Sequence, residues 1–489
     1  MKNMNIKPLI AIAILLNLVI IAWVILRPNA TKPVDISGIG SELVSTSTLE
    51  EGRYDLSGQA DQMNIILISL DALRYDYTGL SGVQGLTRHL DQFAEEATVF
   101  HDTTSVAPWT LPSHMSVWTA RWPSIHQVTN KLKLLASEQM VENSLSAGIS
   151  TYPDLLLGQG YLAGGFTGGA GVQARYGFGR NFDQYLDDQY FGGFDHSIPA
   201  ALQWIEEHQD QRFFLFLHGY DVHGQYPLAD GMLNSLKGSH NTKLSGEIEE
   251  NATLREEGLS AIVNPGDAST LAGTLSDEDA DFLKELYKAK VRAADQRVGS
   301  FLSQIRQMGL FERSIIIIMS DHGDEFMEHR SIDHGATLYE EQLRVVMMMR
   351  FPGYARRHDI YSPVRSIDLF PTVFEVLGLP GSTGVDGHSL LPLMQGETQE
   401  LPIFAETDYR LYRHLRSYRK GDYKLILDLQ DDGKELYHLG DDPQELNNIS
   451  SSKPRVTYEM EQALREWMER SHSNPQDYMG VRQKPISIF

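Results

Sequence analysis

Six residues of types that bind metals or attack esters stand at the ends of apolar or helical segments of this sequence. They are Asp71, Thr110, His218, His223, Asp321 and His322. Carboxylates and imidazoles combined with a hydroxyl oxygen suit a divalent cation such as Zn²⁺ or Mn²⁺ better than Ca²⁺, which prefers shells made only of oxygen. A cation beside a threonine hydroxyl lowers the pKa of that hydroxyl and makes it a nucleophile. If these segments meet in the fold, the residues predict a metal-dependent site for covalent catalysis.

Thr110 begins the stretch Thr-Leu-Pro-Ser-His and is expected at the N-cap of a helix that has Pro112 in its first turn. A helix N-terminus favours an oxyanion, because unpaired N–H groups and the positive end of the helix dipole point at it. Capping is nevertheless the common role of a threonine in this position. The stretch alone therefore leaves two roles open for Thr110, cap and nucleophile.

The other candidate residues follow short apolar runs that are expected to form strands. The runs are 64–70 before Asp71, 213–217 before His218 and 314–319 before Asp321. Helical patterns lie between them, at 86–97, 198–208 and 276–308. Strands that alternate with helices predict an α/β fold with a mostly parallel central sheet flanked by helices. In such folds ligands bind at the carboxyl edge of the sheet, so the three runs are expected to deliver their polar residues to one place.

The last part of the chain has a different pattern. Residues 423–429 and 435–439 are typical of two strands joined by a hairpin, and a helix is expected near 457–470. This predicts a small C-terminal α+β subdomain with an antiparallel sheet. The expected organisation is a transmembrane anchor at 1–27, a linker at 28–62, a catalytic domain at 63–400 with an insertion at 225–274, and the C-terminal subdomain at 401–489.

The anchor is predicted from an apolar run at residues 9–26 that is broken only by Asn17 and carries no charge. At ~1.5 Å per residue, a helix of this length roughly spans a hydrocarbon core. Lys2 and Lys7 favour a cytoplasmic N-terminus. We therefore expect a single-pass protein of the cell membrane with its catalytic domain outside the cytoplasm, in the periplasm of a Gram-negative cell. A cleaved secretory signal is the alternative.

Composition excludes several classes of function. The chain has no cysteine, which excludes disulfides, thiolate metal sites and a cysteine nucleophile. Its net charge of -23 makes it a poor binder of nucleic acid, so no nucleic-acid partner is expected. An anionic substrate must then meet a local group of cations, for which Arg121 and Lys131 are candidates.

Several segments together resemble the sulfatase family of the alkaline phosphatase superfamily. They are 64–76, 110–114, 218–223, 320–324, 333–335 and 435–443, in the family's order. The resemblance implies the family's fold and one divalent metal bound by Asp71, Thr110, Asp321 and His322. The donor types favour Zn or Mn for this metal, and Ca or Mg are the alternatives. The resemblance also implies that Thr110 is the nucleophile, and that His223 and His334 contact the transferred group or the leaving oxygen. His218 is a weaker candidate for contact with the substrate.

The sequence departs from the sulfatase pattern at the nucleophile. Sulfatases proper have a cysteine or serine that is oxidised to formylglycine, and threonine cannot become that aldehyde. The set of Thr110, Asp321 and His322 is more similar to phosphodiesterases and phospho-group transferases of the same superfamily. We therefore expect a metal-dependent hydrolase that cleaves a phosphate ester (phosphodiester or phosphonate) or a sulfate ester of a small molecule, glycan or lipid through a covalent Thr110 intermediate. The alternatives are a phospho-group transferase acting on an envelope glycan or lipid, and a catalytically inactive binding module of the envelope.

Overall fold

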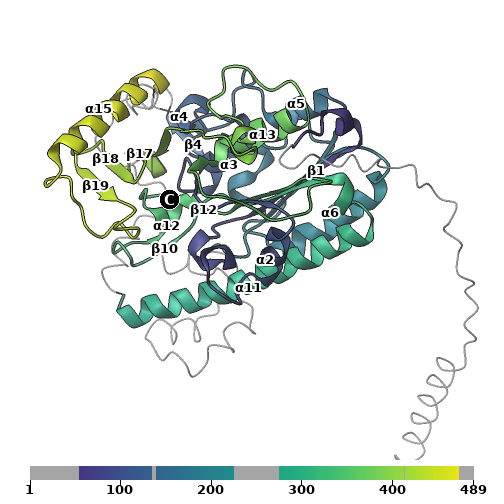
Figure 1. Ribbon diagram of the computed structural model, residues 1–489, viewed down its shortest axis with the longest axis horizontal. Coiled ribbons are helices and arrows are strands. Elements are labelled where there is room, and N and C mark those ends of the chain that lie inside the picture. Colours follow the sequence, from purple (N-terminus) through teal and green to yellow (C-terminus); the bar gives the residue numbers. More distant parts are fainter. Residues whose placement is uncertain (1–53, 135–138, 225–274, 412, 473–489) are drawn as a thin grey trace, which may run out of the picture. The chain divides into compact units, whose positions relative to one another are not determined.

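The computed structural model describes residues 54–134, 139–224, 275–411 and 413–472, all within the compact unit Leu49–Phe489 (Figure 1). The predicted anchor, most of the predicted linker and the predicted insertion at 225–274 lie outside these ranges. Within them, no helix combines the length and apolar character needed to cross a bilayer.

The centre of the fold is an eight-stranded sheet. Its order is β14 (His358–Ile360), β2 (Thr98–Phe100), β13 (Met347–Arg350), β9 (Ser314–Ser320), β1 (Asn64–Leu70), β8 (Phe213–Gly219), β6 (Leu162–Phe166) and β7 (Gln184–Leu186). The five strands from β9 to β7 are parallel, whereas β13 runs antiparallel to both of its neighbours. The predicted α/β class with a mostly parallel sheet is confirmed.

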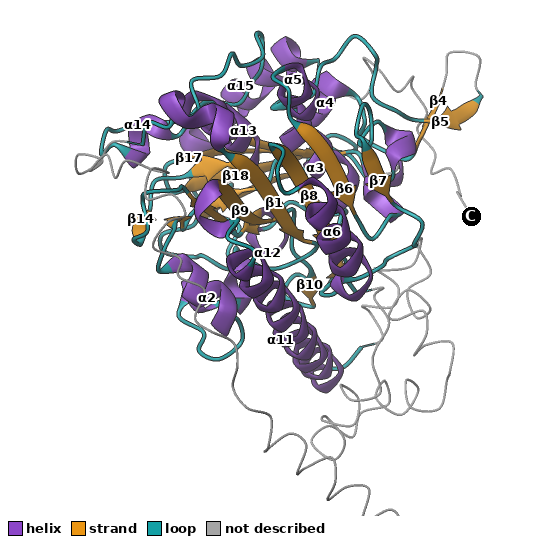
Figure 2. Ribbon diagram, turned by 90° about the vertical axis from the view of Figure 1, so that its right-hand side faces the viewer, coloured by secondary structure: helices purple, strands orange, loops and turns teal. Residues whose placement is uncertain are grey.

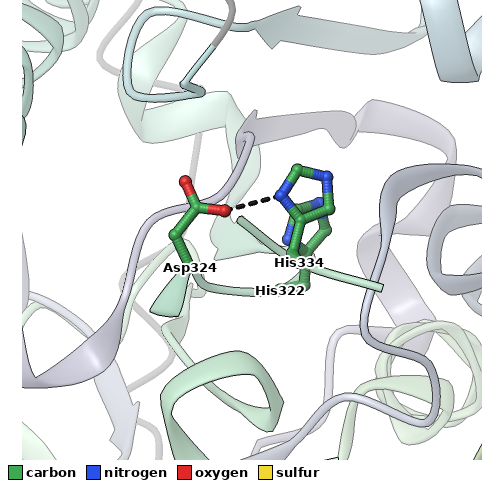
Figure 3. A group of neighbouring side chains, drawn as sticks. All are labelled: His322, Asp324 and His334. Carbon is green, nitrogen blue, oxygen red and sulfur yellow. Dashed lines mark hydrogen bonds and ion pairs between the residues drawn. The ribbon is translucent and has the colours of Figure 1, made fainter. Parts of the chain in front are cut away.

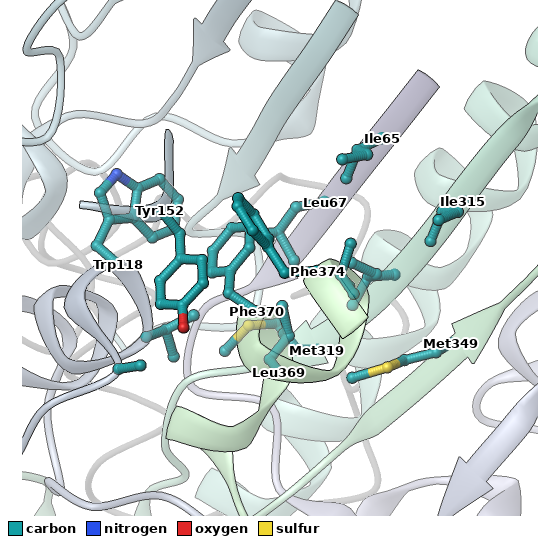
Figure 4. Packing of buried hydrophobic residues seen from close by; sticks show 14 of the residues in the cluster. Ile65, Leu67, Trp118, Tyr152, Ile315, Met319, Met349, Leu369, Phe370 and Phe374 are labelled. Atoms are coloured by element: carbon teal, nitrogen blue, oxygen red, sulfur yellow. The ribbon is translucent and has the colours of Figure 1, made fainter. Parts of the chain in front are cut away.

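Helices cover both faces of this sheet, which explains why its central strands are continuous apolar runs. Successive side chains of a strand point to opposite faces. Ile66 and Ile68 of β1 accordingly pack with α2 (Arg88–Ala94), α6 (Phe194–His208) and α11 (Asp277–Gln307) (Figure 2). On the other face, Ile65 and Leu67 pack with α3 (Thr110–Thr119), α5 (Tyr152–Gly158) and α13 (Leu369–Val376), as Figure 4 shows for Trp118, Tyr152 and Phe370.

The C-terminal part forms a second sheet, as the sequence predicts. It is antiparallel, in the order β16 (Ile403–Thr407), β17 (Leu415–Lys420), β18 (Tyr423–Asp428) and β19 (Lys434–His438), and it is followed by α15 (Pro454–Ser471). Trp467 of α15 stacks on Phe404 of β16 with ring centroids 4.5 Å apart, and its edge meets Trp122, which follows α3. This sheet, α15 and the segment that follows α3 therefore share one apolar cluster.

Shorter elements complete the described chain. They are α4 (Pro123–His126), α12 (Glu340–Leu343), α14 (Leu391–Met394), β3 (Thr103–Thr104), β4 (Leu132–Leu134), β5 (Met140–Glu142), β10 (Glu325–Phe326), β11 (Ile332–Asp333), β12 (Arg344–Val345) and β15 (Val364–Arg365). The apolar run 345–349, which looks like one strand, is divided: β12 pairs with β3 in a separate three-stranded sheet, and β13 joins the central sheet.

A buried ion pair joins the C-terminal sheet to α12. Lys424 is only 2% exposed, and its Nζ lies 2.8 Å from Glu340 Oε1 and 3.0 Å from Glu445 Oε1. We expect Lys424→Met to destabilise the protein by about 3–5 kcal/mol, because it leaves two carboxylates without their cation. Denaturant midpoints measure this. Lys434→Met is the control. Lys434 is 31% exposed, and its partner Glu461 keeps Arg465 as a second cation, so its loss is expected to cost about 0–1 kcal/mol; equal losses in the two variants would contradict the prediction.

Candidate active site

Strand register brings two aspartates together at the carboxyl edge of the sheet. β1 pairs in parallel with β9, and Leu70 is opposite Ser320, so Asp71 and Asp321 leave the sheet side by side. On its other side β1 pairs with β8, where His218 is opposite Ser69. His218 Nε2 lies 3.3 Å from Asp71 Oδ2. All three side chains are fully buried, as expected for residues directly at the ends of central strands.

Thr110 is the first residue of α3, and the structure corrects its predicted capping role. The N-cap is Trp109, and no side chain caps this helix. The Thr110 hydroxyl instead donates to Asp71 Oδ2 at 3.1 Å and lies 3.3 Å from His322 Nε2. Helix α3 is tied to the sheet edge by Ser113, whose hydroxyl donates to the main-chain oxygen of Asp321 at 2.8 Å. The hydroxyl of Thr110 thus faces the acids at the edge of the sheet rather than its own helix.

The ring of His322 is oriented so that a nitrogen lone pair faces the same point. Its Nδ1 lies 3.0 Å from the carbonyl oxygen of Gly323, which can only accept, so Nδ1 carries the proton. In the neutral ring Nε2 is then unprotonated. Nε2 lies 3.4 Å from Asp321 Oδ2 and 3.8 Å from Asp71 Oδ1. Such an Nε2 could bind a metal ion, with its orientation fixed by the bond on the other side of the ring.

The side chains of this group fit a divalent cation. Asp71, Asp321 and His322 could hold an ion, and Thr110 Oγ1 is close to two of them. Within the described part of the chain, Asp71 Oδ1 and Asp321 Oδ2 have no hydrogen-bond partner although both are buried. Burial and the like charge of Asp321 raise the pKa of Asp71 well above its ordinary value. Two unsatisfied carboxylate oxygens in one buried place are costly unless a cation lies between them.

Two further histidines face each other across the site. The ring centroid of His334 lies 4.2 Å from that of His322 and 4.8 Å from that of His223. His223 Nε2 lies 3.9 Å from Asp71 Oδ1. His334 Nδ1 donates to Asp324 Oδ1 at 2.5 Å (Figure 3). Burial lowers the pKa of His334, but Asp333 and Asp324 outweigh it and hold the pKa well above its ordinary value. Burial lowers the pKa of His223, as do the neighbouring charges, so the two rings have opposite tendencies.

Of the two cations predicted to meet an anion, the structure brings only Lys131 near this group. Lys131 Nζ lies 3.5 Å from the hydroxyl of Tyr190, and the next residue, Phe191, stacks on the ring of His223 at 4.9 Å. Arg121 lies beyond the other end of α3 and donates to the carbonyl oxygen of Thr383. A helix of this length places it roughly 15 Å from Thr110, so the structure separates Arg121 from a group bound at Thr110, and its contact with a larger substrate stays a prediction.

Sequence reasoning did not assign a role to several residues that support the site. Asp324 holds His334, and its place two residues after His322 is the one signal that could have found it. His114 lies beside the candidate metal ligands, with Nδ1 3.0 Å from the Thr110 carbonyl oxygen and 3.3 Å from Asp321 Oδ2. Lys290 of α11 donates to the main-chain oxygen of His223 at 2.8 Å. No local pattern marks Lys290, because the contact joins segments far apart in the chain.

Comparison with known proteins agrees with the geometry. The family profile described as Sulfatase matches residues 63–379, and the profile N-sulphoglucosamine sulphohydrolase, C-terminal, matches residues 327–473. Arylsulfatase K of Danio rerio is 23% identical over 452 residues, which cover 83% of each chain.

Two solved structures show the likeness of the fold. One is a protein in complex with its substrate D-glucosamine-2-N,6-O-disulfate, with a TM-score of 0.69, 18% identity and coverage of 85% of this chain and 99% of that chain. The other is a phosphonate monoester hydrolase from Silicibacter pomeroyi, with a TM-score of 0.65, 17% identity and coverage of 85% and 97%. The resemblance read from the motifs is confirmed. Because the first profile spans more than half of the sequence, the chain belongs to the sulfatase family of ester hydrolases.

Proposed function

We propose that this hydrolase cleaves a phosphate ester, a phosphodiester or a phosphonate ester, with Thr110 as covalent nucleophile. The observation that carries the proposal is the position of Thr110 Oγ1, 3.1 Å from Asp71 Oδ2 and 3.3 Å from His322 Nε2. A capping threonine would bond to its own helix. This one is directed at buried metal-ligand groups, which is the arrangement that activates a hydroxyl.

The residues divide the reaction into two steps. The Thr110 oxygen attacks phosphorus, the bond from phosphorus to the leaving oxygen breaks, and Asp71 Oδ2 is placed to take the hydroxyl proton. Water then attacks the phosphoryl-threonine and gives a proton to His334, and the bond from phosphorus to the Thr110 oxygen breaks. Asp71 returns its proton to that oxygen, and the phosphate product leaves. A divalent cation held by Asp71, Asp321, His322 and Thr110 supplies charge neutralisation and lowers the pKa of the hydroxyl. The imidazole ligand favours Zn²⁺ or Mn²⁺ over Ca²⁺ or Mg²⁺.

His334 is the proposed general acid for the leaving oxygen. Its Nδ1 is bound by Asp324, which leaves Nε2 for the substrate, and the neighbouring carboxylates keep the ring protonated. His223 faces it and is proposed to bind the transferred group, with Lys131 at the rim beyond Phe191. His218 Nε2 lies 3.3 Å from Asp71 Oδ2, so we propose that His218 orients Asp71 as a metal ligand instead of binding the substrate.

We expect Asp324→Asn to lower kcat by about 10–100-fold with little change in KM, because His334 loses the carboxylate that orients and charges it. Asp359→Asn is the matched control. Asp359 also binds a histidine, with Asp359 Oδ1 2.6 Å from His101 Nε2, in a pair outside the candidate site. Steady-state kinetics on one ester measures both variants. Equal kcat values for Asp324→Asn and the wild type would remove the role given to His334.

Sulfate ester hydrolysis is the second candidate, because the relatives that match most of the chain are named as sulfatases. The phosphonate monoester hydrolases of similar fold favour phosphorus. The chemistry of the nucleophile also favours phosphorus, since a sulfated threonine has no easy route to turnover, whereas water can resolve a phosphoryl-threonine.

Mass spectrometry of enzyme trapped with substrate tests the proposal. The metal-loaded protein is mixed with 4-nitrophenyl esters of a phosphate diester, a phosphonate and a sulfate, quenched and digested. A phosphoryl adduct on Thr110 is expected, and a sulfuryl adduct there would favour the second candidate. Transfer of the phosphoryl group to an added alcohol in preference to water would indicate a transferase. Metal-loaded protein that turns over none of the esters would favour a binding module.

The anchor in the cell membrane and the location of the catalytic domain outside the cytoplasm remain part of the proposal.

A further inference from the structure

The γ-methyl group of Thr110 faces a wall made by two residues that the proposed function has not used. Gly171 lies in the short 3-10 turn Ala170–Val172, and Tyr220 directly follows β8. A Cβ atom on Gly171 would lie 2.8 Å from Thr110 Cβ and 2.9 Å from Thr110 Cγ2. Carbon atoms that are not bonded pack at about 3.5–4.0 Å. The backbone of Gly171 therefore touches the nucleophile's side chain, and no larger residue fits there without a shift.

Backbone conformation does not explain this glycine. The φ angle of Gly171 lies outside the left-handed region, whereas Ala170 before it has a φ of 45°. Glycine is favoured where φ is positive, and other residues are strained there. The turn thus has alanine at the position that suits glycine and glycine at a position that any residue can adopt. Contact with Thr110 accounts for the glycine at 171.

Tyr220 holds the turn in place. It is fully buried, and its hydroxyl accepts from the Gly171 N–H at 2.9 Å and donates to the Gly169 carbonyl oxygen at 3.2 Å. The same hydroxyl would lie 3.2 Å from a Cβ on Gly171, so it borders the pocket that receives the Thr110 methyl group. The ring of Tyr220 is itself fixed between His218 and Phe191, with centroids 4.6 Å and 5.0 Å away. Gly171 therefore cannot withdraw from Thr110 without breaking buried hydrogen bonds.

The tetrahedral geometry of Thr110 Cβ turns this contact into a choice of rotamer. When the methyl group lies against Gly171, Oγ1 points to Asp71 and His322. Another staggered rotamer would move the oxygen away from those ligands. We propose that Gly171 and Tyr220 are positioning residues that select the attacking rotamer of Thr110. This inference rests on the proposed function of Thr110 as nucleophile.

The test is a double-mutant cycle in the metal-loaded full-length protein, with the ester that the wild type turns over fastest. Gly171→Ala is measured alone and together with Thr110→Ser, which keeps the oxygen and removes the methyl group. The Cβ atom added at position 171 overlaps with Cβ of residue 110 in both backgrounds, so any damage to the fold from this overlap is the same in both. Its overlap with Cγ2 exists only when residue 110 is threonine. With threonine at 110, we expect Gly171→Ala to lower kcat by about 100-fold and to change KM little. With serine at 110, we expect the same substitution to lower kcat by only about 10-fold.

A second variant keeps the cycle informative if Gly171→Ala does not fold. Tyr220→Phe removes the two bonds that hold the turn, and it is expected to lower kcat with threonine at 110 and to have little effect in the Thr110→Ser background. Gly148→Ala is the control, because its added Cβ would meet one atom at 3.8 Å, the Ser146 hydroxyl oxygen. Inactive Thr110→Ser enzyme would also support the inference, since serine lacks only the methyl group.

Equal losses in both backgrounds, or no loss from Gly171→Ala, would overturn the inference. That outcome is distinct from failure of the proposed function, which would appear as near-normal activity of Thr110→Ala. When Thr110→Ala is inactive and the two losses are equal, the nucleophile stands and the positioning role of Gly171 and Tyr220 does not.

Discussion

Thr110→Ala is expected to lower kcat/KM by at least about 1,000-fold while the protein keeps its fold. The substitution removes the oxygen that lies 3.1 Å from Asp71 Oδ2 and 3.3 Å from His322 Nε2. The helix does not depend on Thr110 as a cap, so its loss leaves α3 intact.

Thr119→Ala is the matched control for Thr110→Ala. Thr119 is a buried threonine at the other end of α3, and its hydroxyl donates to the Met115 carbonyl oxygen at 2.8 Å within the helix. Both variants lose the same atoms from the same helix, but only one loses an atom of the site. Circular dichroism and thermal melting check the fold, and steady-state rates on the three esters check activity. Near-normal rates in Thr110→Ala would remove the nucleophile and the two-step reaction with it.

The sequence was sufficient for the parts of the site that follow from periodicity. A buried parallel strand is a continuous apolar run, and the residue after it leaves at the carboxyl edge, so the sequence alone places Asp71 and Asp321 together. The register Leu70 to Ser320 makes that placement definite. The antiparallel hairpin of β18 and β19 was predictable from its two alternating runs and the turn between them.

Other parts depended on the direction of side chains, which spacing does not give. Thr110 looks like a cap, but the cap position is one residue earlier, at Trp109. Arg121 is near Thr110 in sequence, yet a whole helix separates them in space. Gly171 is one of many glycines, and its contact with Thr110 follows from the approach of two segments 61 residues apart in the chain. Such pairs become visible only when the tertiary structure is known.

Asp71→Asn is expected to have opposite effects on stability with and without metal. In chelated protein, Asp71 and Asp321 are neighbouring buried carboxylates, and burial together with the like charge of Asp321 raises the pKa of Asp71. A carboxyl whose pKa is raised on folding lowers the stability of the fold at pH values above its unfolded pKa. The neutral amide removes that penalty, so the melting temperature of the chelated variant should lie above that of chelated wild type, by roughly 2 °C.

With Zn²⁺ or Mn²⁺ present the order should reverse. A cation that binds only the folded state stabilises that state more when it binds more tightly. Asp71→Asn removes a charged ligand, so the wild type gains more stability from the metal than the variant does.

Asp408→Asn is the control: Asp408 is also buried, but it lies 3.0 Å from Arg416 Nη1 and 2.8 Å from His414 Nδ1. These neighbours outweigh its burial and lower its pKa, so its loss should destabilise the protein by a similar amount in both states. A variant Asp71→Asn that is less stable than wild type in chelator as well as in metal would show that the two unsatisfied oxygens do not repel each other. Because the same variant should also lose activity by at least about 100-fold in saturating metal, a variant that is more stable than wild type in chelator but nearly inactive in metal is the signature that links the charge at this sheet edge to catalysis.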